Sequence, residues 1–353
     1  MSRPSAPPAS GQAPRDPASA DAADASAGRA PAQARSADHF ADAAEVITRF
    51  AAHGYIADTR IATAIFLAER LQKPILVEGP AGCGKTELAK VLADALGTQL
   101  IRLQCYEGLD EAKALYEWAY PKQLLYTQIL RDKIGELLAQ TRTLGEAVTA
   151  LAAQDDAFFS EKFLLPRPLL SALRAERRVV LLIDEVDRAV AEFEAFLLEV
   201  LSDFQVSIPE LGTLRAAHVP LVILTSNNAR EMTDALKRRC LYLNVGFPDA
   251  AREQAIAHAR LPEAPARLVA DVVRVVQALR QLDLKKNPSV SETLEWVRAL
   301  LILSAEQLDR GLCVDTLNLV LKYEGDLERA HEKLGELFPA AGTPANTGRT
   351  KPS

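Results

Sequence analysis

The sequence predicts an α/β domain with a buried parallel sheet, followed by a smaller all-α domain. Short uninterrupted apolar runs at 75–77, 179–183 and 221–225 alternate with helix-like segments. Such runs are typical of strands buried on both faces, as in parallel sheets that are covered by helices. From about residue 249 onward only helical periodicity remains, which predicts the second domain.

The elements of the α/β domain follow one another from residue 58. A helical stripe of apolar residues indicates the first helix, and Gly97 ends the second, as glycine commonly does. After the strand at 179–183, a further stripe predicts a helix whose apolar face lies in the core. Its residues are Phe193, Phe196, Leu197, Val200 and Leu201. The expected elements before it are helices over 58–72 and 85–96 and strands over 75–77, 100–103 and 179–183, and the strand over 221–225 follows it.

The all-α domain is expected to contain four helices, punctuated by Pro248, Pro262, Pro265 and Pro288. Trp296 has apolar helical neighbours and is predicted to be a core residue. The expected helices span 250–260, 264–282, 290–304 and 314–327.

Composition excludes several classes of protein. The 353 residues carry a net charge of −6, which argues against broad binding to nucleic acid or anionic lipid. No apolar run reaches the roughly 18 residues that a membrane span needs. The four cysteines form no CxxC pair, and no histidine lies at metal-ligand spacing from them. We therefore expect reduced thiols in a cytoplasmic protein, without direct membrane insertion.

Both ends of the chain are expected to be disordered tails. Residues 1–38 contain no Leu, Ile, Val or aromatic residue, so they cannot bury enough apolar surface to offset the entropy of ordering. They also lack the apolar core of a secretory signal, and their aspartates argue against a transit peptide. Residues 338–353 are rich in proline and glycine.

The residues between the strand at 75–77 and the next helix fit the pattern GxxxxGK[ST]. Glycines let backbone N–H groups approach phosphates, the lysine contacts the β- and γ-phosphates, and the threonine hydroxyl holds Mg²⁺. The N-terminus of the following helix adds a favourable dipole. This context predicts a site for a nucleoside triphosphate, in which Cys83 is interpreted as a small spacer. Its residues are Gly79, Pro80, Ala81, Gly82, Cys83, Gly84, Lys85 and Thr86.

Two carboxylates, Asp184 and Glu185, end the apolar strand at 179–183. With a phosphate loop upstream, we expect Asp184 and Thr86 to hold Mg²⁺. Glu185 is expected to activate the attacking water as a general base. Asp187 is interpreted as a helix cap or surface residue.

The strand at 221–225 ends in polar residues that include Asn227. An amide beside the acidic strand can hold the attacking water, although asparagine is also common in turns. Further along, Arg238 and Arg239 precede the apolar residues 241–243. By itself this arginine pair is more typical of an exposed basic turn than of a catalytic site.

In this order, the phosphate loop, LLIDEVD (181–187), TSN (225–227) and ALKRRC (235–240) resemble the AAA+ ATPases. More specifically, the sequence is similar to the MoxR group and, within it, to CoxD-type proteins encoded with molybdenum hydroxylases such as carbon monoxide dehydrogenase. The stretches that carry this similarity are RLQCYEGLDEAKALYEW, EFEAFLLEVLSDFQVSIPELGT, VILTSN and DALKRRCLY. The resemblance covers about residues 40–330.

The resemblance implies an AAA+ αβα sandwich over 39–246 and a helical lid domain over 247–337. It implies that Asn227 is the sensor-1 residue and that Arg239, or alternatively Arg238, is an arginine finger that reaches the γ-phosphate of a neighbouring subunit. It also implies ATP and Mg²⁺ as cofactors and a homo-oligomeric ring, usually a hexamer. The sequence departs from the family in the lid, because residues 287–293 contain no sensor-2 arginine.

Between the motifs, two segments resemble insertions of this family. Residues 106–118 are acidic and aromatic and 123–163 are mostly helical, which predicts an element inserted near the ring face. Residues 204–215 predict a hairpin before sensor 1. Both are candidates for contact with a substrate protein, although simple packing explains Tyr106, Tyr116 and Trp118 at least as well.

The leading hypothesis for function is an ATP-driven chaperone that remodels a client during maturation of a molybdenum hydroxylase. The resemblance implies a von Willebrand A-domain protein as its adaptor, and sulfur or metal insertion as the process that it serves. An AAA+ nucleic-acid motor or loader is the alternative, disfavoured by the acidic balance. A signalling GTPase is a third possibility, disfavoured because the chain has no NKxD motif.

Overall fold

The computed structural model describes residues 39–129, 163–208 and 212–338, together with 143, 145 and 146. Its centre is a five-stranded sheet in which every neighbouring pair is parallel. The strands are β1 (Ile75–Glu78), β2 (Leu100–Gln104), β5 (Val180–Asp184), β8 (Leu221–Ser226) and β9 (Leu241–Asn244). They lie in the order β2-β5-β8-β1-β9. This confirms the predicted α/β class and the four predicted strands, and it adds β9 at one edge.

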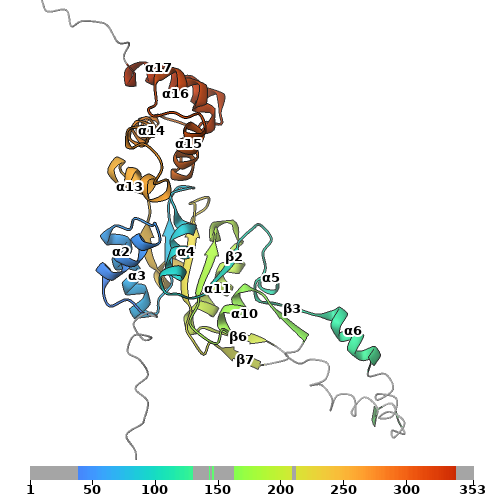
Figure 1. Ribbon diagram of the computed structural model, residues 1–353. Coiled ribbons are helices and arrows are strands. Elements are labelled where there is room, and N and C mark those ends of the chain that lie inside the picture. Colours follow the sequence, from blue (N-terminus) through green and yellow to red (C-terminus); the bar gives the residue numbers. More distant parts are fainter. Residues whose placement is uncertain (1–38, 130–142, 144, 147–162, 209–211, 339–353) are drawn as a thin grey trace, which may run out of the picture.

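Helices cover both faces of the sheet and form a three-layer sandwich (Figure 1). One face is covered by α2 (Ala43–Ala52), α3 (Thr59–Leu71) and α4 (Lys85–Ala95), and the other by α10 (Pro168–Leu173) and α11 (Ala191–Asp203). Thus α3 and α4 confirm the helices expected over 58–72 and 85–96. The side chain of Asp58 accepts a hydrogen bond from the N–H of Ile61 at 2.8 Å, which explains where α3 begins.

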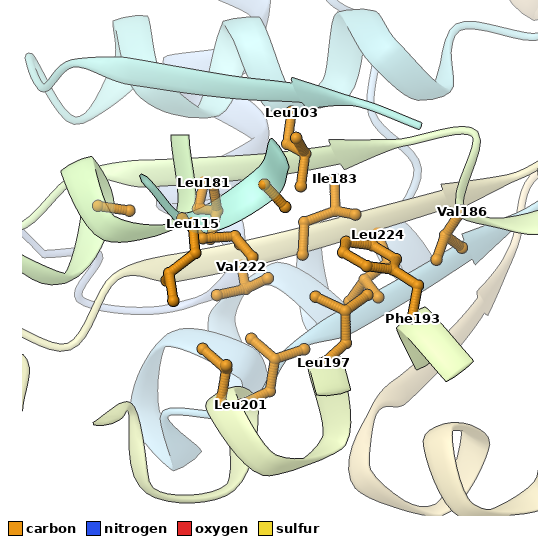
Figure 2. Close-up of a cluster of buried hydrophobic side chains, with 14 of the residues drawn as sticks. Leu103, Leu115, Leu181, Ile183, Val186, Phe193, Leu197, Leu201, Val222 and Leu224 are labelled. Carbon is orange, nitrogen blue, oxygen red and sulfur yellow. The ribbon is translucent and has the colours of Figure 1, made fainter. Parts of the chain in front are cut away.

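The apolar layer under α11 lies next to the acidic pair, and Val186, which follows Glu185, belongs to it. Phe193, Leu197, Val200 and Leu201 are buried, and Phe196 packs against them, which confirms the predicted stripe. Because strand residues alternate between faces, β5 and β8 supply residues to both layers of the sandwich. Figure 2 labels Leu103, Leu115, Leu181, Ile183, Val186, Phe193, Leu197, Leu201, Val222 and Leu224.

Two smaller sheets extend from the sandwich. β6 (Gln205–Ile208) and β7 (Gly212–Arg215) form the predicted antiparallel hairpin, whose turn at 209–211 lies outside the described residues. α5 (Glu111–Leu115) leads into β3 (Tyr116–Trp118), which pairs with β4 (Leu164–Pro166). Between these strands, α6 (Tyr120–Ile129) projects away from the sheet (Figure 1). Most of the predicted helical insertion lies outside the described residues.

The C-terminal part is all helical, as predicted. α13 (Ala250–Arg260), α14 (Ala266–Leu279) and α15 (Val290–Ile302) confirm three of the four expected helices. Trp296 of α15 is fully buried, and its indole N–H donates to the hydroxyl of Thr316 at 2.8 Å.

The fourth expected helix, over 314–327, is wrong. α16 (Arg310–Thr316) ends inside this range, a 3-10 turn over Leu317–Leu319 follows, and α17 (Glu324–Leu337) begins after an extended Tyr323. Leu317, Val320 and Leu321 are buried from irregular backbone, so their spacing imitates that of a helix.

The expected tails fall almost entirely outside the described residues, with Phe338 as the exception. Residues 1–38 and 339–353 lie outside the described residues. Phe338, assigned above to the second tail, instead packs against the core of the C-terminal helices (250–337, called the lid below) and under the Arg274 guanidinium. In the described part of the chain, no helix combines the length and the apolarity that a membrane crossing requires. All four cysteines are buried free thiols.

Candidate active site

The phosphate loop, residues 79–86, connects β1 to α4 and runs close to two other parts of the chain. A Cβ atom on Gly79 would lie 2.0 Å from the carbonyl oxygen of Val245, and one on Gly82 would lie 2.3 Å from the Cβ of Ser289. Both glycines also have positive φ angles. No side chain fits at either position, so the loop is shaped by close backbone approach as well as by its conformation.

Lys85 is buried at the start of α4 and points along the loop. Its ammonium group donates hydrogen bonds to the carbonyl oxygens of Gly79 (2.7 Å) and Pro80 (2.8 Å) and to the side-chain oxygen of Asn227 (2.8 Å). Burial lowers the pKa of Lys85, while Cys83 and the carboxylates at 184, 185 and 187 act in the opposite direction. The lysine therefore joins the phosphate loop to the end of β8.

Cys83 is packed inside the loop. Its thiol donates to the carbonyl oxygen of Val245 at 3.1 Å, and burial raises its pKa. A thiol with a raised pKa has little nucleophilic thiolate at neutral pH. This geometry agrees with the interpretation of Cys83 as a spacer.

Asp184 and Thr86 lie side by side, as the metal hypothesis requires. The Thr86 hydroxyl donates to Asp184 Oδ1 at 3.1 Å, and the Thr225 hydroxyl donates to the same oxygen at 2.5 Å. Asp184 ends β5 and is buried. Carboxylate and hydroxyl oxygens are the hard ligands that Mg²⁺ prefers, so these residues fit that ion.

Glu185 follows Asp184 in a left-handed conformation, with φ of 55°, which turns the chain sharply at the end of β5. Its Oε2 accepts a hydrogen bond from the Gln104 side-chain amide at 3.0 Å and lies 3.0 Å from Arg188 Nε. Its Oε1 lies 3.4 Å from the Asn227 side-chain amide. The expected base and the expected sensor are therefore neighbours.

Sequence reasoning missed Gln104 and misplaced Asp187. Gln104 ends β2, one residue beyond the strand that the apolar run predicts. Asp187, expected at the surface or as a cap, is buried, and its Oδ2 accepts hydrogen bonds from the N–H groups of Asn227 (3.0 Å) and Ala229 (2.9 Å). The expectation fails because these partners lie 40 residues or more along the chain. Asp187 fixes the backbone that carries Asn227.

Two adjoining cavities meet at the phosphate loop. One, of about 300 Å³, is lined by Lys85, Thr86, Asp184, Glu185 and Asn227, with Ser291 of the lid opposite. The other, of about 230 Å³, lies between sandwich and lid, is more apolar, and shares Gly82, Gly84, Glu87 and Ser291 with the first. A polar cavity with a lysine next to an apolar one matches the two halves of a nucleoside triphosphate.

The lid reaches the phosphate loop through α15. Ser289 and Glu292 form a capping box at its start, and Ser289 packs against Gly82. Arg280 supports the segment that leads into α15, because it donates to the Pro288 carbonyl oxygen at 2.8 Å and pairs with buried Glu253 at 2.7 Å. The Ser289 side chain therefore packs directly on the Gly82 backbone and joins the start of α15 to the phosphate loop.

Lys285 and Lys286 are exposed and line neither cavity. The Lys286 ammonium pairs with Glu292 at 2.8 Å, and the Lys285 ammonium lies 4.0 Å from the centroid of the Tyr323 ring.

The structure does not bring Arg238 and Arg239 into the cavity of their own chain. Both lie at the end of α12 (Asp234–Arg239), are exposed, and form no ion pair with any described residue. Each side chain is therefore accessible to a neighbouring molecule.

A parallel sheet with a phosphate loop after β1, an acidic pair at the end of β5 and an amide after β8 defines a P-loop nucleoside triphosphatase. Residues 75–245 match the family "ATPase family associated with various cellular activities (AAA)", and this part of the chain is an AAA ATPase domain. The protein is an ATPase, and its cofactors are ATP and Mg²⁺.

The individual proteins to which this chain is similar have low sequence identity to it. The chain is 26% identical over 244 residues to the denitrification regulatory protein NirQ of Stutzerimonas stutzeri, covering 68% of this chain and 73% of NirQ. It is 26% identical over 241 residues to an uncharacterized protein of Staphylococcus haemolyticus, covering 66% of this chain and 78% of that protein. A solved structure of the Thermotoga maritima RuvB Holliday junction branch migration motor matches with 14% identity and a TM-score of 0.42. It covers 74% of this chain and 67% of the RuvB chain.

Replacement of the buried lysine gives the first test of the site. Lys85→Ala removes the cation expected to contact the β- and γ-phosphates, and we expect ATP affinity to fall about a hundredfold or more, since hydrogen bonds between an ammonium group and a phosphate are strong. Titration of a fluorescent ATP analogue measures the effect. Lys113→Ala, at an exposed lysine of α5, is the control and should bind normally. Tight binding by a folded Lys85→Ala variant would refute the phosphate-loop assignment.

Proposed function

We propose that this ATPase is a MoxR-type chaperone that remodels a client protein during maturation of a molybdenum-containing hydroxylase, by assisting cofactor sulfuration or metal insertion. In this proposal it works in the cytoplasm as a hexameric ring of identical subunits. A von Willebrand A-domain protein acts as adaptor between the ring and the client.

Within each subunit the proposed roles follow the geometry of the site. Residues 79–86 hold the phosphates, and Thr86 with Asp184 holds Mg²⁺, which when bound neutralises phosphate charge. Glu185 takes a proton from the attacking water, and Asn227 orients that water. Arg239, or Arg238 in its place, stabilises the γ-phosphate in the next subunit.

The observation that carries the remodelling proposal is the short connection between the site and two projecting elements. These elements are the β6–β7 hairpin and the segment that contains α5 and β3. Glu185 is followed by a 3-10 turn, η2 (Val186–Arg188), then by α11 and the β6–β7 hairpin, which returns through β8 to Asn227. A rigid helix thus connects the proposed base to the hairpin. On the other side, Gln104 is followed closely by α5 and β3. A change at the nucleotide would therefore reach both elements over short connections.

Two similarities support the choice of process. NirQ is described as a denitrification regulatory protein, which favours a regulatory role for this ATPase. The motifs shared with CoxD-type proteins favour molybdenum hydroxylase maturation as the process. The net charge of −6 counts against the nucleic-acid motor.

The decisive experiment is capture of partners with an ATP-trapping variant. Glu185→Gln should retain ATP and hold its client and adaptor, and Lys85→Ala serves as the matched control that cannot bind ATP. We expect a molybdenum hydroxylase and a von Willebrand A-domain protein to co-purify with the first variant only. Stimulation of hydrolysis by DNA, without stimulation by a purified molybdenum hydroxylase, would contradict the proposal and favour the motor.

A further inference from the structure

Two arginines of α13 join the lid to the sandwich, and Figure 1 shows this helix at the junction between them. Arg252, in the first turn of α13, pairs with Asp58 at 2.8 Å and donates to the carbonyl oxygen of Ile56 at 2.8 Å. Arg260, the last residue of α13, donates to Glu87 Oε1 at 2.5 Å. The two attachments are therefore at opposite ends of one helix, about 12 Å apart at the usual rise per residue.

The second attachment joins two helix ends that suit its charges. Glu87 lies in the first turn of α4, where the helix dipole favours a carboxylate, and Arg260 ends α13, where the dipole favours a cation. The side chains of Arg260 and Glu87 are 34% and 33% exposed. Water and salt therefore screen this ion pair only in part.

This ion pair lies at the wall of the space assigned above to the nucleotide. Glu87 follows Thr86 directly and lines both cavities, and Arg260 lines the more apolar one. A Cβ atom on Gly54 would lie 3.9 Å from Arg260 Nε, so the guanidinium also rests on the segment before α3. Arg260 thus connects the lid to the helix that begins at the phosphate loop.

The two ends of α13 differ in how they are held. The end that begins after Asp249 is attached twice, by the chain that enters it from the sandwich and by Arg252. The Arg260 end is free to lift when its pair with Glu87 breaks. The Thr293 hydroxyl of α15 donates to Glu253 of α13 at 2.7 Å, so α15 would follow this movement. α15 carries Ser291, which lines both cavities.

Loss of the arginine would not leave the carboxylate of Glu87 without a cation. Lys90, one turn further along α4, lies 3.4 Å from Glu87 Oε2. Repulsion between Glu87 and the phosphates of a nucleotide would therefore stay partly offset. The main consequence of breaking the pair is the position of the lid.

We propose that Arg260 is a positioning residue that keeps an adenine nucleotide in its cavity, because its ion pair with Glu87 holds the lid down on the sandwich. The inference rests on the assignment of the two cavities to the nucleotide. While the pair is formed, α15 stays over the cavities and the nucleotide leaves slowly. When the pair breaks, the Arg260 end of α13 lifts, the cavities open and the nucleotide is released.

The test measures how fast the nucleotide leaves. A fluorescent ADP analogue bound to the whole protein is chased with unlabelled ADP in a stopped-flow instrument. We expect Arg260→Gln to raise the release rate about two- to fivefold, the usual range for a partly exposed ion pair. The release rate of the wild type should rise with added NaCl, because salt screens the pair, and that of the variant should respond less.

A double-mutant cycle tests whether Arg260 acts through Glu87. Glu87→Gln should raise the release rate to a similar extent, and the double variant should release the analogue no faster than either single variant. Additive effects would mean that the arginine acts on the nucleotide itself, and would contradict the proposed role. Arg260→Lys keeps a cation and should recover part of the slow release, and a complete lack of recovery would count against the ion pair.

Arg274→Gln is the matched control. It removes a lid arginine that is 44% exposed, pairs with Asp271 at 3.1 Å and lines neither cavity, so the release rate should stay that of the wild type. Equal acceleration by this variant would mean that any loosening of the lid has the same effect, and would overturn the specific role of Arg260. Normal binding with unchanged release in Arg260→Gln would overturn the inference alone. A wild-type protein that does not bind the analogue would overturn the nucleotide site and the inference together.

Discussion

Glu185→Gln is expected to bind ATP with nearly the wild-type affinity and to hydrolyse it about 10²–10⁴ times more slowly, the usual contribution of a general base. Glutamine keeps the shape of the side chain but cannot take up the proton of the attacking water. Lys85, Thr86 and Asp184 are untouched, so the ATP contacts proposed for them remain. Single-turnover hydrolysis and analogue binding, measured on one preparation, separate the two effects.

The comparison for this prediction is Glu117→Gln, which removes the charge of an exposed glutamate that pairs with Arg167 outside the cavity. It should hydrolyse ATP as the wild type does. If Glu185→Gln itself turned over at the normal rate, another group would have to be the base. If it lost binding as well, Glu185 would hold the nucleotide rather than activate water.

The central strands were predictable from sequence because both of their faces are covered. A strand buried on both faces reads as an apolar run wherever it stands in the sheet. β9 carries no such signal, because it is an edge strand of four residues in which Tyr242 is 54% exposed. Its place beside β1 follows from hydrogen bonding to Pro74 and Glu78, which local periodicity does not reveal.

The residues of the candidate site also fall into two groups, those that local sequence predicts and those that it does not. Lys85, Thr86, Asp184 and Glu185 belong to short motifs whose chemistry depends on local spacing, and the structure places them together. Arg102 and Gln104 lie on β2 and donate hydrogen bonds to Asp184 and Glu185 on the neighbouring strand. Their place in the site therefore depends on β2 lying next to β5. Strand order is set by the packing of the whole domain, so these two residues look like ordinary polar residues of an edge strand.

The contact between the lid and the phosphate loop was not predictable from the sequence either. Sequence reveals that an arginine is missing between 287 and 293 but not what replaces its contact. Ser289 approaches Gly82 because the buried pair of Glu253 and Arg280 holds the preceding loop, and these two residues lie on α13 and at the C-cap of α14. A contact built by three separate segments has no local sequence signature.

The start of α12, the helix that carries Arg238 and Arg239, is fastened to η2 and α11 of the same chain. Arg230 donates to the Ala189 carbonyl oxygen at 2.6 Å and pairs with the buried Glu194. Glu194 also accepts a hydrogen bond from the N–H of Thr233, the residue that caps α12. The segment from Asn227 to α12 is thus fastened to η2 and α11. The exposed arginines therefore hold a defined position relative to the site, although they do not enter it.

Mixing two inactive variants should therefore restore hydrolysis if an arginine acts on the neighbouring subunit. Arg239→Ala alone should lose about 10³-fold or more in rate, the range of arginine fingers in other nucleoside triphosphatases. Lys85→Ala is expected to bind ATP about a hundredfold more weakly or worse, but it keeps Arg239. In an equal mixture, about a quarter of the interfaces in a ring would pair an intact phosphate loop with an intact arginine. The steady-state rate of the mixture measures the recovery, and Arg238→Ala mixed in the same way identifies which arginine is used. Absence of recovery at every ratio, for both arginines, would leave their exposed position without a catalytic role.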